Sequence, residues 1–373
     1  MFIHHLQLVH YRNYEQLELA FDNKINIFQG FNAQGKTNVL EAIYMVALAK
    51  SHRTSKEKEL VQWGQSFSVI KADIEKKHGN LKLEMQLSNK GKKAKVNQLE
   101  QRKLSDYIGT LNIVMFAPED LNLVKGNPQH RRRFIDIEIG QISPSYLYQL
   151  TQYQKVVQQR NNLLKDFRMD KKNKLEMLEI YNLQLIQYGT KVIKKRLGFL
   201  EKLNHWAKEI HFGITSQKEE LEIRYQSSIS KELMGLEDTE ISELYEQKLL
   251  KVKEQELERG VSLVGPHRDD LDFYINRISV QSFGSQGQQR NTALSLKLAE
   301  IELIYEEVGE YPILLLDDVL SELDFQRQTQ LIHTIRDKVQ TFITTTSTES
   351  IDEETLMQSS LFYVEAGLIR RLN

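Results

Sequence analysis

Hydrophobic and polar positions alternate along the first part of the chain in the way that half-buried strands require. The alternation predicts strand structure over Leu6–Phe21, and the mostly apolar run Lys24–Gly30 predicts a short buried strand. Apolar residues then recur at helical spacing along Thr37–Ser51, which predicts an amphipathic helix. Two further alternating runs, Phe67–Ile74 and Leu81–Leu87, are separated by a polar turn and predict a hairpin.

The pattern changes after Pro128, where alternation gives way to helical periodicity. Apolar residues recur every three or four positions from Arg131 to Lys208, which predicts two or three long helices. The acidic stretch Lys231–Arg259 extends this helical module as far as Pro266. Strands and helices then alternate again. The predicted elements are strands at 272–276, 279–282, 313–317 and 341–347, and helices at about 288–309 and 325–338.

Strand-rich segments on both sides of a helical segment indicate one α/β domain assembled from two separated parts of the sequence. We expect the N-terminal part over residues 1–128, a helical insertion over 129–260 and the C-terminal part over 261–373. The expected fold class is α/β, a head of mixed sheets with flanking helices, with the insertion forming a helical arm.

Composition excludes several classes of chemistry. The chain has no cysteine, which excludes disulfides, thiolate metal sites and thiol nucleophiles. Apolar runs such as Ile313–Leu316 are far shorter than the roughly 20 residues of a membrane helix. The N-terminus lacks the pattern of a signal peptide, so we expect a cytoplasmic protein without a membrane partner.

The net charge of −1 conceals segments of opposite sign. Basic residues exceed acidic ones between 125 and 208, and the reverse holds between 211 and 258. Two interpretations stay open: the basic insertion presents solvated helix faces, or it presents an electrostatic surface for DNA. The cluster that the second interpretation singles out is Lys191, Lys194, Lys195 and Arg196.

A phosphate-binding loop is the clearest chemical signal in the sequence. The segment from Gly30 to Thr37 matches G-x-x-x-x-G-K-[ST] without exception, between a predicted strand and a predicted helix. In this motif backbone N–H groups surround the phosphates, the lysine reaches the β- and γ-phosphates, and the threonine hydroxyl binds Mg²⁺. The candidate nucleotide-binding residues are Gly30, Phe31, Asn32, Ala33, Gln34, Gly35, Lys36 and Thr37.

The apolar run Ile313–Leu316 ends in two carboxylates, Asp317 and Asp318. Ligands gather at the carboxyl ends of strands in open α/β sheets. Asp317 is therefore predicted to hold magnesium through water, and Asp318 to orient or deprotonate the attacking water.

Two later segments narrow the class of phosphate-loop protein. Ser285, Gly287 and Gln288 begin the helix before the acidic strand, and the segment 321–324, Ser-Glu-Leu-Asp, follows that strand. This order resembles the ATP-binding-cassette ATPases, in which the signature of one subunit caps the γ-phosphate held by the other. Taken alone, Ser285 is also a good helix N-cap, and both interpretations stay open at this point.

Within that superfamily the whole chain resembles the RecF family, relatives of the SMC-type ATPases. The segments that carry the resemblance are 10–14 (His-Tyr-Arg-Asn-Tyr), 116–121 (Phe-Ala-Pro-Glu-Asp-Leu), 126–136, 265–270 (Gly-Pro-His-Arg-Asp-Asp) and 284–290 (Gly-Ser-Gln-Gly-Gln-Gln-Arg). The resemblance implies an ATPase head of the ABC/SMC type with an inserted arm. It also implies an ATP-dependent homodimer that binds single-stranded or gapped DNA in recombinational repair, replication restart and SOS induction.

The same resemblance implies cooperation with RecR and RecO in loading RecA, with ATP and Mg²⁺ as cofactors. SMC-type relatives use an arginine such as Arg12 at the nucleotide, although a plain surface role is the alternative. The chain departs from the wider cassette pattern in having Asp318 in place of the usual glutamate and Thr344–Ser347 in place of the switch histidine. Both departures imply slow hydrolysis.

Three competing hypotheses are a small-molecule kinase that uses the same loop, an ATPase subunit of a membrane transporter, and a scaffold that binds ATP without turnover. A kinase leaves the Ser285 segment unexplained. The long insertion between Lys36 and Asp317 argues against a transporter subunit. Lys36 and Asp318 favour some turnover over a pure scaffold.

Overall fold

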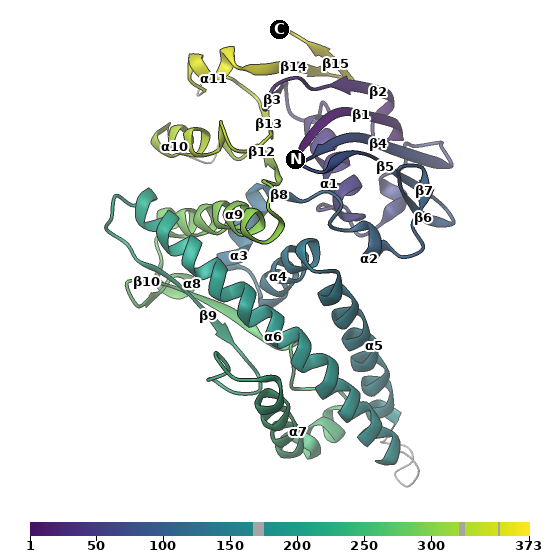
Figure 1. Ribbon diagram of the computed structural model, residues 1–373, viewed down its shortest axis with the longest axis vertical. Helices are drawn as coiled ribbons and strands as arrows, with labels where there is room; N and C mark the ends of the chain where they lie inside the picture. Colours follow the sequence, from purple (N-terminus) through teal and green to yellow (C-terminus); the bar gives the residue numbers. More distant parts are fainter. Residues whose placement is uncertain (167–174, 321–324, 350) are drawn as a thin grey trace. The chain divides into compact units, whose positions relative to one another are not determined.

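The computed structural model describes residues 1–166, 175–320, 325–349 and 351–373 (Figure 1). The chain forms two compact units. The first combines Met1–Asp120 with Lys297–Asn373, and the second is Leu121–Leu296. The long helix α9 (Gln286–Val308) begins in the second unit and ends in the first.

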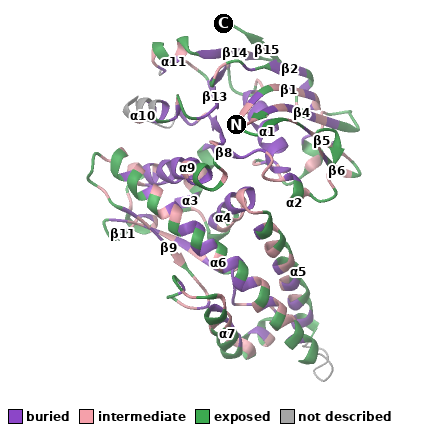
Figure 2. Ribbon diagram, in the orientation of Figure 1, coloured by how far each residue is buried: buried purple, intermediate pink, exposed green. Residues whose placement is uncertain are grey.

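The first unit contains a six-stranded sheet in which all strands are parallel except the edge strand β15 (Leu368–Arg371). Its order is β15, β14 (Ser359–Glu365), β3 (Ile25–Gln29), β13 (Thr341–Thr345), β12 (Ile313–Asp317) and β8 (Ile113–Phe116). All residues of β8, β12 and β13 are buried (Figure 2). Continuous apolar runs such as Ile-Leu-Leu-Leu fit strands that are covered on both faces.

A second six-stranded sheet of the first unit is antiparallel. Its order is β2 (Tyr14–Ala20), β1 (Phe2–Tyr11), β4 (Phe67–Lys76), β5 (Gly79–Ser88), β6 (Gly91–Val96) and β7 (Leu99–Glu100). Buried residues alternate with more exposed ones along β4 and β5, as expected for a sheet with one covered face. The helices of this unit are α1 (Lys36–Leu48), η1 (Glu57–Glu59), α2 (Leu104–Tyr107), η2 (Pro118–Asp120), α10 (Phe325–Ile335) and α11 (Glu353–Met357).

The second unit is mainly helical. Its helices are α3 (Leu121–Lys125), α4 (Pro128–Ile142), α5 (Pro144–Asp166), α6 (Leu175–Ile214), α7 (Asp238–Arg259) and α8 (Val280–Phe283). A small antiparallel sheet has the order β11 (Ile278–Ser279), β10 (Asp270–Ile275) and β9 (Leu221–Gln226). A buried ion pair of Arg160 on α5 with Glu256 on α7, at 2.5 Å, joins two of the helices.

The predicted boundaries differ from these units. The insertion was predicted at 129–260, whereas the second unit runs from Leu121 to Leu296. The cause is β9, a strand inside the stretch predicted as helical, which pairs with β10 and so joins residues beyond 260 to the second unit. The strand predicted at 279–282 is also wrong, because β11 ends at Ser279 and α8 follows.

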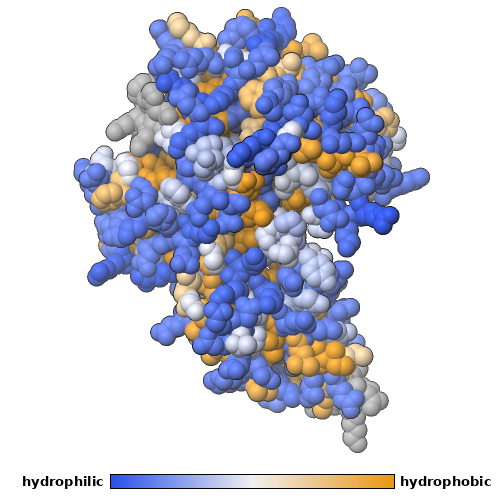
Figure 3. Space-filling view, viewed as in Figure 1, coloured by the Kyte–Doolittle hydropathy of each residue, from blue (hydrophilic) through white to orange (hydrophobic). Residues whose placement is uncertain are grey.

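Most other predicted elements agree with the structure. The predicted hairpin is formed by β4 and β5 in one continuous register, and the predicted long helices are α4, α5 and α6. Hydrophilic side chains cover most of the face seen in Figure 3. Among the described residues, no helix combines the length and the apolar character needed to cross a membrane.

Candidate functional site

The loop between β3 and α1 leaves no space for a Cβ atom at two positions. Gly35 has a φ of +118°, and a Cβ there would lie 2.6 Å from the Asn13 Nδ2 atom. A Cβ on Gly30 would lie 2.3 Å from the carbonyl oxygen of Val364. Because real Cβ atoms do not approach so closely, both glycines of the motif are required by the geometry.

Three donors from outside the loop fix its carbonyl and side-chain oxygens. Asn13 Nδ2 donates to the Gln34 carbonyl oxygen at 3.1 Å, and the Tyr14 hydroxyl donates to the Gly35 carbonyl oxygen at 3.0 Å. The Ala366 N–H donates to Gln34 Oε1 at 2.6 Å. None of these bonds uses an N–H group of the loop, so they hold the loop without competing for an anion.

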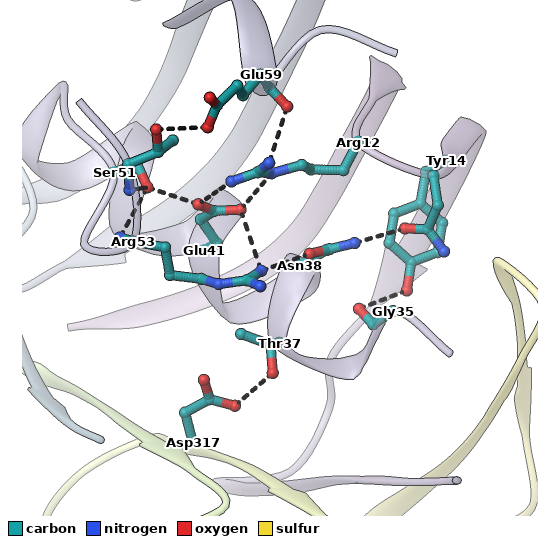
Figure 4. A network of polar contacts seen from close by, with 12 residues as sticks. Arg12, Tyr14, Gly35, Thr37, Asn38, Glu41, Ser51, Arg53, Glu59 and Asp317 are labelled. Atoms are coloured by element: carbon teal, nitrogen blue, oxygen red, sulfur yellow. Dashed lines mark hydrogen bonds and ion pairs between the residues drawn. The ribbon is translucent and has the colours of Figure 1, made fainter. Parts of the chain in front are cut away.

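Lys36 and Thr37 begin α1 beside the acidic end of β12. The Lys36 ammonium donates to the carbonyl oxygens of Gly30 and Phe31 at 2.6 and 2.9 Å, so the side chain lies over the loop. The Thr37 hydroxyl donates to Asp317 Oδ1 at 2.9 Å (Figure 4). Burial lowers the pKa of Lys36, against the opposing charges of Asp318 and Asp317. The two motifs predicted from the sequence therefore meet.

Thr344 on β13 ties the two carboxylate residues together, and the sequence analysis gave it no role there. Its hydroxyl donates to Asp317 Oδ1 at 2.7 Å and accepts the Asp318 N–H at 2.9 Å. Burial raises the pKa of Asp317, while bonds from Thr344 and Thr37 act in the opposite direction. Asp318 has a φ of +54°, in the left-handed region. Its backbone therefore turns away from the strand immediately after Asp317.

Arg12 lies in a polar network beside α1 (Figure 4). Its guanidinium donates two bonds to Glu41 at 2.8 and 2.7 Å, and the Ser51 hydroxyl donates to the same carboxylate at 2.5 Å. Burial opposes the charged form of Glu41, but the bonds from Arg12 and Ser51 leave its pKa below the ordinary value. Arg12 is thus engaged in fixing α1.

The network also contains a cation that sequence reasoning missed. Arg53 donates to Asn38 Oδ1 at 3.0 Å and lies 3.9 Å from Glu41. Its side chain is 45% exposed, and its charge acts to lower the pKa of Asp317. Because the residue lies in the loop after α1, no motif in the sequence indicates its place beside the phosphate loop.

The predicted signature begins α9 as a capped helix. The Ser285 N–H donates to Gln288 Oε1 at 2.9 Å, and the Gln288 N–H donates to the Ser285 hydroxyl oxygen at 3.2 Å. This reciprocal pair is a capping box. Ser285 is exposed, while Gly287 and Gln288 are half-buried. The accepted bond still leaves the Ser285 hydroxyl hydrogen able to donate to an anion.

The predicted site residues divide between the two units. The loop, Arg12, Asp317 and Asp318 belong to the first unit, whereas Ser285, Gly287 and Gln288 belong to the second. The segment 321–324, which was predicted to follow the acidic strand as a further site motif, lies outside the described residues. An exposed aromatic side chain lies in the phosphate loop and another just before the signature turn: Phe31 is 74% and Phe283 is 79% exposed.

Three of the four residues of the predicted basic cluster make polar contacts within the second unit. Lys191 pairs with Asp238, and Lys194 donates to the Leu236 carbonyl oxygen at 2.6 Å. Arg196 is buried and pairs with Asp136 at 2.8 Å. A second basic run, Arg131–Arg133, is similar, because buried Arg131 pairs with Asp270 at 2.7 Å and Arg132 donates to the Asp269 carbonyl oxygen. These contacts favour structural roles for all of these residues except Lys195.

The oxygen atoms at the end of β12 suit a magnesium ion. Thr37 and Asp317 offer a hydroxyl and a carboxylate, which are the hard oxygen ligands that Mg²⁺ takes. Within the described residues no cluster of three or more His, Asp or Glu side chains is placed to hold a metal ion. A magnesium ion here would therefore take its remaining ligands from phosphates and water, as it does in nucleotide sites.

Comparison with known proteins identifies one family, and the matches extend over nearly the whole chain. The model of the "RecF/RecN/SMC N terminal domain" family matches residues 2–369. A "DNA replication and repair protein RecF" of Bacillus cereus (strain AH820) is 58% identical over 370 residues, which cover 99% of this chain and 98% of that protein. Proteins of the same description from Bacillus anthracis (strain CDC 684 / NRRL 3495) and Bacillus thuringiensis (strain Al Hakam) match equally well, at 58% identity over the same shares.

Solved structures give the same result. A structure described as "recombination mediator protein RecF-ATPrS in RecFOR pathway" has a TM-score of 0.92 at 34% identity, and covers 100% of this chain and 98% of its own. Its counterpart described as "RecF-ATP" has a TM-score of 0.92 at 33% identity, with the same coverage. An SMC head bound to the C-winged helix domain of ScpA has a TM-score of 0.55 at 14% identity over 100% of this chain and 97% of its own, and this likeness concerns the fold alone.

Proposed function

The chain belongs to the RecF family of DNA replication and repair proteins, and from this premise we propose that it is an ATP-dependent DNA-binding protein that hydrolyses ATP slowly. The observation that carries the proposal is the meeting of Thr37 and Asp317, 2.9 Å apart, beside a loop whose two motif glycines have no space for a side chain. The relatives solved as RecF-ATP and RecF-ATPrS support ATP as the nucleotide.

The first unit would grip the triphosphate. The N–H groups of Gly30–Thr37 would surround the β-phosphate, and Lys36 would leave the carbonyl oxygens of Gly30 and Phe31 for the β- and γ-phosphates. Thr37 and Asp317 would hold Mg²⁺, which neutralises phosphate charge when bound. Arg12 would brace α1 through Glu41, at the side of the loop where the nucleotide would bind.

Asp318 would orient or deprotonate the water that attacks the γ-phosphate. Its left-handed backbone and the Thr344 bond to its N–H fix where the residue leaves the strand. An aspartate has one methylene fewer than a glutamate, so its carboxylate reaches less far toward water. Slow turnover follows from this shorter reach, because general-base efficiency depends on close contact with the water.

The second unit would complete the site of another copy. Ser285, Gly287 and Gln288 start α9 with an exposed hydroxyl and the positive end of a helix dipole, which together suit a γ-phosphate. Phe31 and Phe283 also leave an exposed aromatic side chain beside each motif, which the association of two copies would cover. We therefore propose an ATP-dependent homodimer with ATP held between two copies.

The further steps follow from the family. The ATP-bound dimer would bind single-stranded or gapped duplex DNA and act with RecO and RecR to help load RecA, in the cytoplasm. Relatives described as acting in the RecFOR pathway support this part of the proposal. Hydrolysis would then separate the two copies and release the DNA.

Sedimentation of the purified protein tests the proposal in one series. The protein alone and with ADP should sediment as a monomer, with ATP and Mg²⁺ as a dimer, and with gapped DNA and ATP as a dimer bound to DNA. A protein that binds ATP but sediments as a monomer in every condition would contradict the proposed function. Binding of gapped DNA only in the presence of ATP would distinguish an ATP-dependent DNA-binding protein from a scaffold that binds DNA regardless of nucleotide.

A further inference from the structure

Gln288 in the first turn of α9 has an amide whose orientation is fixed from both ends. Its oxygen Oε1 accepts the Ser285 N–H at 2.9 Å, and its nitrogen Nε2 donates to Glu219 Oε1 at 2.9 Å. A carboxylate accepts hydrogen bonds and cannot donate one. If the amide were flipped, Gln288 Oε1 would face the Glu219 carboxylate and Nε2 would face an N–H group. Glu219 therefore selects the orientation that caps Ser285.

Glu219 is itself held by the end of α6. Its second oxygen lies 3.3 Å from His211 Nε2, and its N–H donates to the Thr215 hydroxyl at 3.3 Å. His211 is fully buried, and its Nδ1 lies 3.0 Å from the Ser295 hydroxyl on α9. The contacts form a continuous chain. Ser295 on α9 contacts His211 on α6, His211 contacts Glu219, and Glu219 accepts the bond from Gln288 in the first turn of α9.

Glu219 also places a negative charge behind the turn. Its side chain is 22% exposed, and Gln288 stands between it and Ser285. A carboxylate near a helix N-terminus stabilises the helix, but directly beside an incoming phosphate it would repel that phosphate. The intervening neutral amide keeps the carboxylate one hydrogen bond away from the capped residue.

We propose that Glu219 is a positioning residue of the composite ATP site: it fixes the Gln288 amide so that Ser285 faces the γ-phosphate of a second copy, with the negative charge held behind. This inference rests on the proposed function, because it needs an ATP-dependent dimer. It goes beyond that function in assigning a role to a residue outside every motif, in the segment between α6 and β9.

The first test replaces Glu219 by glutamine in the full-length protein. E219Q keeps the size of the side chain but can also donate, so either orientation of Gln288 becomes possible. ATP binding by the monomer should stay at the wild-type level, because the phosphate loop is untouched. The ATP-dependent dimer should weaken, and turnover at saturating ATP should fall, by about tenfold. The matched control is E220Q, whose carboxylate pairs with Lys208 at 2.5 Å, and it should behave as the wild type.

The second test exchanges the two residues. In the double variant E219Q/Q288E, a carboxylate at 288 accepts both the Ser285 N–H and the amide at 219, so the capping box is preserved. The double variant should unfold at the wild-type temperature and yet dimerise no better than E219Q, because its charge now lies beside Ser285. Recovery of wild-type dimerisation by the exchange would mean that Glu219 only stabilises the helix.

ATP-dependent dimerisation of the wild type, measured beside E219Q, distinguishes failure of this inference from failure of the proposed function. If the wild type dimerises with ATP and E219Q does so equally well, the role of Glu219 is overturned and the proposed function stands. If the wild type does not dimerise with ATP, the proposed function itself is overturned and this inference falls with it.

Discussion

The phosphate loop (residues 30–37) and the signature turn (residues 285–288) are both helix starts that suit an anion, but the chain builds them in different ways. The loop carries its own cation, Lys36, which is buried against the loop carbonyl oxygens. The turn has no charged residue among its four and stands at an exposed serine. The phosphate loop is fixed by several donors from two other segments. The signature turn is fixed by the hydrogen bond between Gln288 and Glu219.

This difference indicates how the two would divide the work. A helix N-terminus without a lysine or arginine stabilises an exposed anion by about 0.3–1 kcal/mol, which is too little to hold a triphosphate alone. The signature turn is therefore suited to a phosphate that another site already holds and neutralises. The loop, with its cation, glycines and magnesium ligands, is suited to hold the nucleotide first.

The largest effect is expected where the loop loses its cation. Lys36→Met removes the only charged donor among residues 30–37, so ATP affinity should fall by about a hundredfold or more, and dimerisation with it. Equilibrium binding of a fluorescent ATP analogue measures this directly. Lys58→Met, on the surface of the same unit, is the control. Wild-type ATP affinity in the Lys36 variant would mean that the loop does not bind the nucleotide.

A second change separates binding from turnover. Asp318→Asn keeps the volume of the side chain and removes a base, so ATP binding should persist while hydrolysis falls by about a hundredfold. The ATP-bound dimer should then last longer than in the wild type. Single-turnover hydrolysis together with equilibrium binding checks both parts. Unchanged hydrolysis would assign the base elsewhere.

The loop and the acidic strand could be predicted from the sequence because each is a short contiguous pattern. Glycines and a lysine at fixed spacing require one backbone shape, and a run of apolar residues before two aspartates requires a buried strand end. The meeting of Thr37 with Asp317 followed from the same motifs, although the two residues are far apart in the chain.

The braces around these motifs could not be predicted in the same way. Glu41, Ser51 and Thr344 are ordinary residues for the helix, loop and strand in which they lie, and only the fold brings each to its partner. The strand β9 was missed because six alternating residues lie between long helices, and its pairing partner β10 lies more than 40 residues later. That pairing, and not local pattern, set the boundary of the second unit.

Acid should destabilise the second unit before the first. Burial lowers the pKa of His211, and it lowers the pKa of His267 to about 4. The unfolded chain takes up these protons near pH 6.5, so stability should fall below that pH by about 1.4 kcal/mol per unit for His267, until its folded pKa is reached. In the first unit, the lowered pKa of Glu41 keeps its contribution above pH 4.5 and loses it only as the pH falls through the folded value.

Hydrogen exchange followed by mass spectrometry from pH 7.5 to 5.5 resolves the two units. Peptides of α5 and α7 should lose protection earlier than those of β3, β12 and β13. His267→Gln should reduce the pH dependence of the second unit, because it removes one of the two histidines that titrate there. Equal loss of protection in both units over this range would mean that the two histidines do not set the acid sensitivity of the second unit.

The smallest effect is expected at the basic cluster of α6. Reversing the charge of Lys191, Lys194 and Lys195 should lower the log–log slope of DNA binding against salt by about 1 unit, and not by 3, because two of the three lysines are already paired within the unit. DNA binding measured over a salt series checks this. A slope reduced by 3 would mean that all three lysines contact DNA phosphates, and would contradict the structural roles of Lys191 and Lys194.

The most direct test of the central claim, that the loop of one copy works with the signature turn of another, is sedimentation of Ser285→Arg with ATP, alone and mixed with Lys36→Met. Ser285→Arg should bind ATP with wild-type affinity and stay monomeric, because the bulky side chain would occupy the place of the partner's γ-phosphate. The mixture contains one intact composite site per heterodimer and should recover part of the ATP-dependent dimer. A Ser285→Arg protein that dimerises with ATP as the wild type does would contradict the claim.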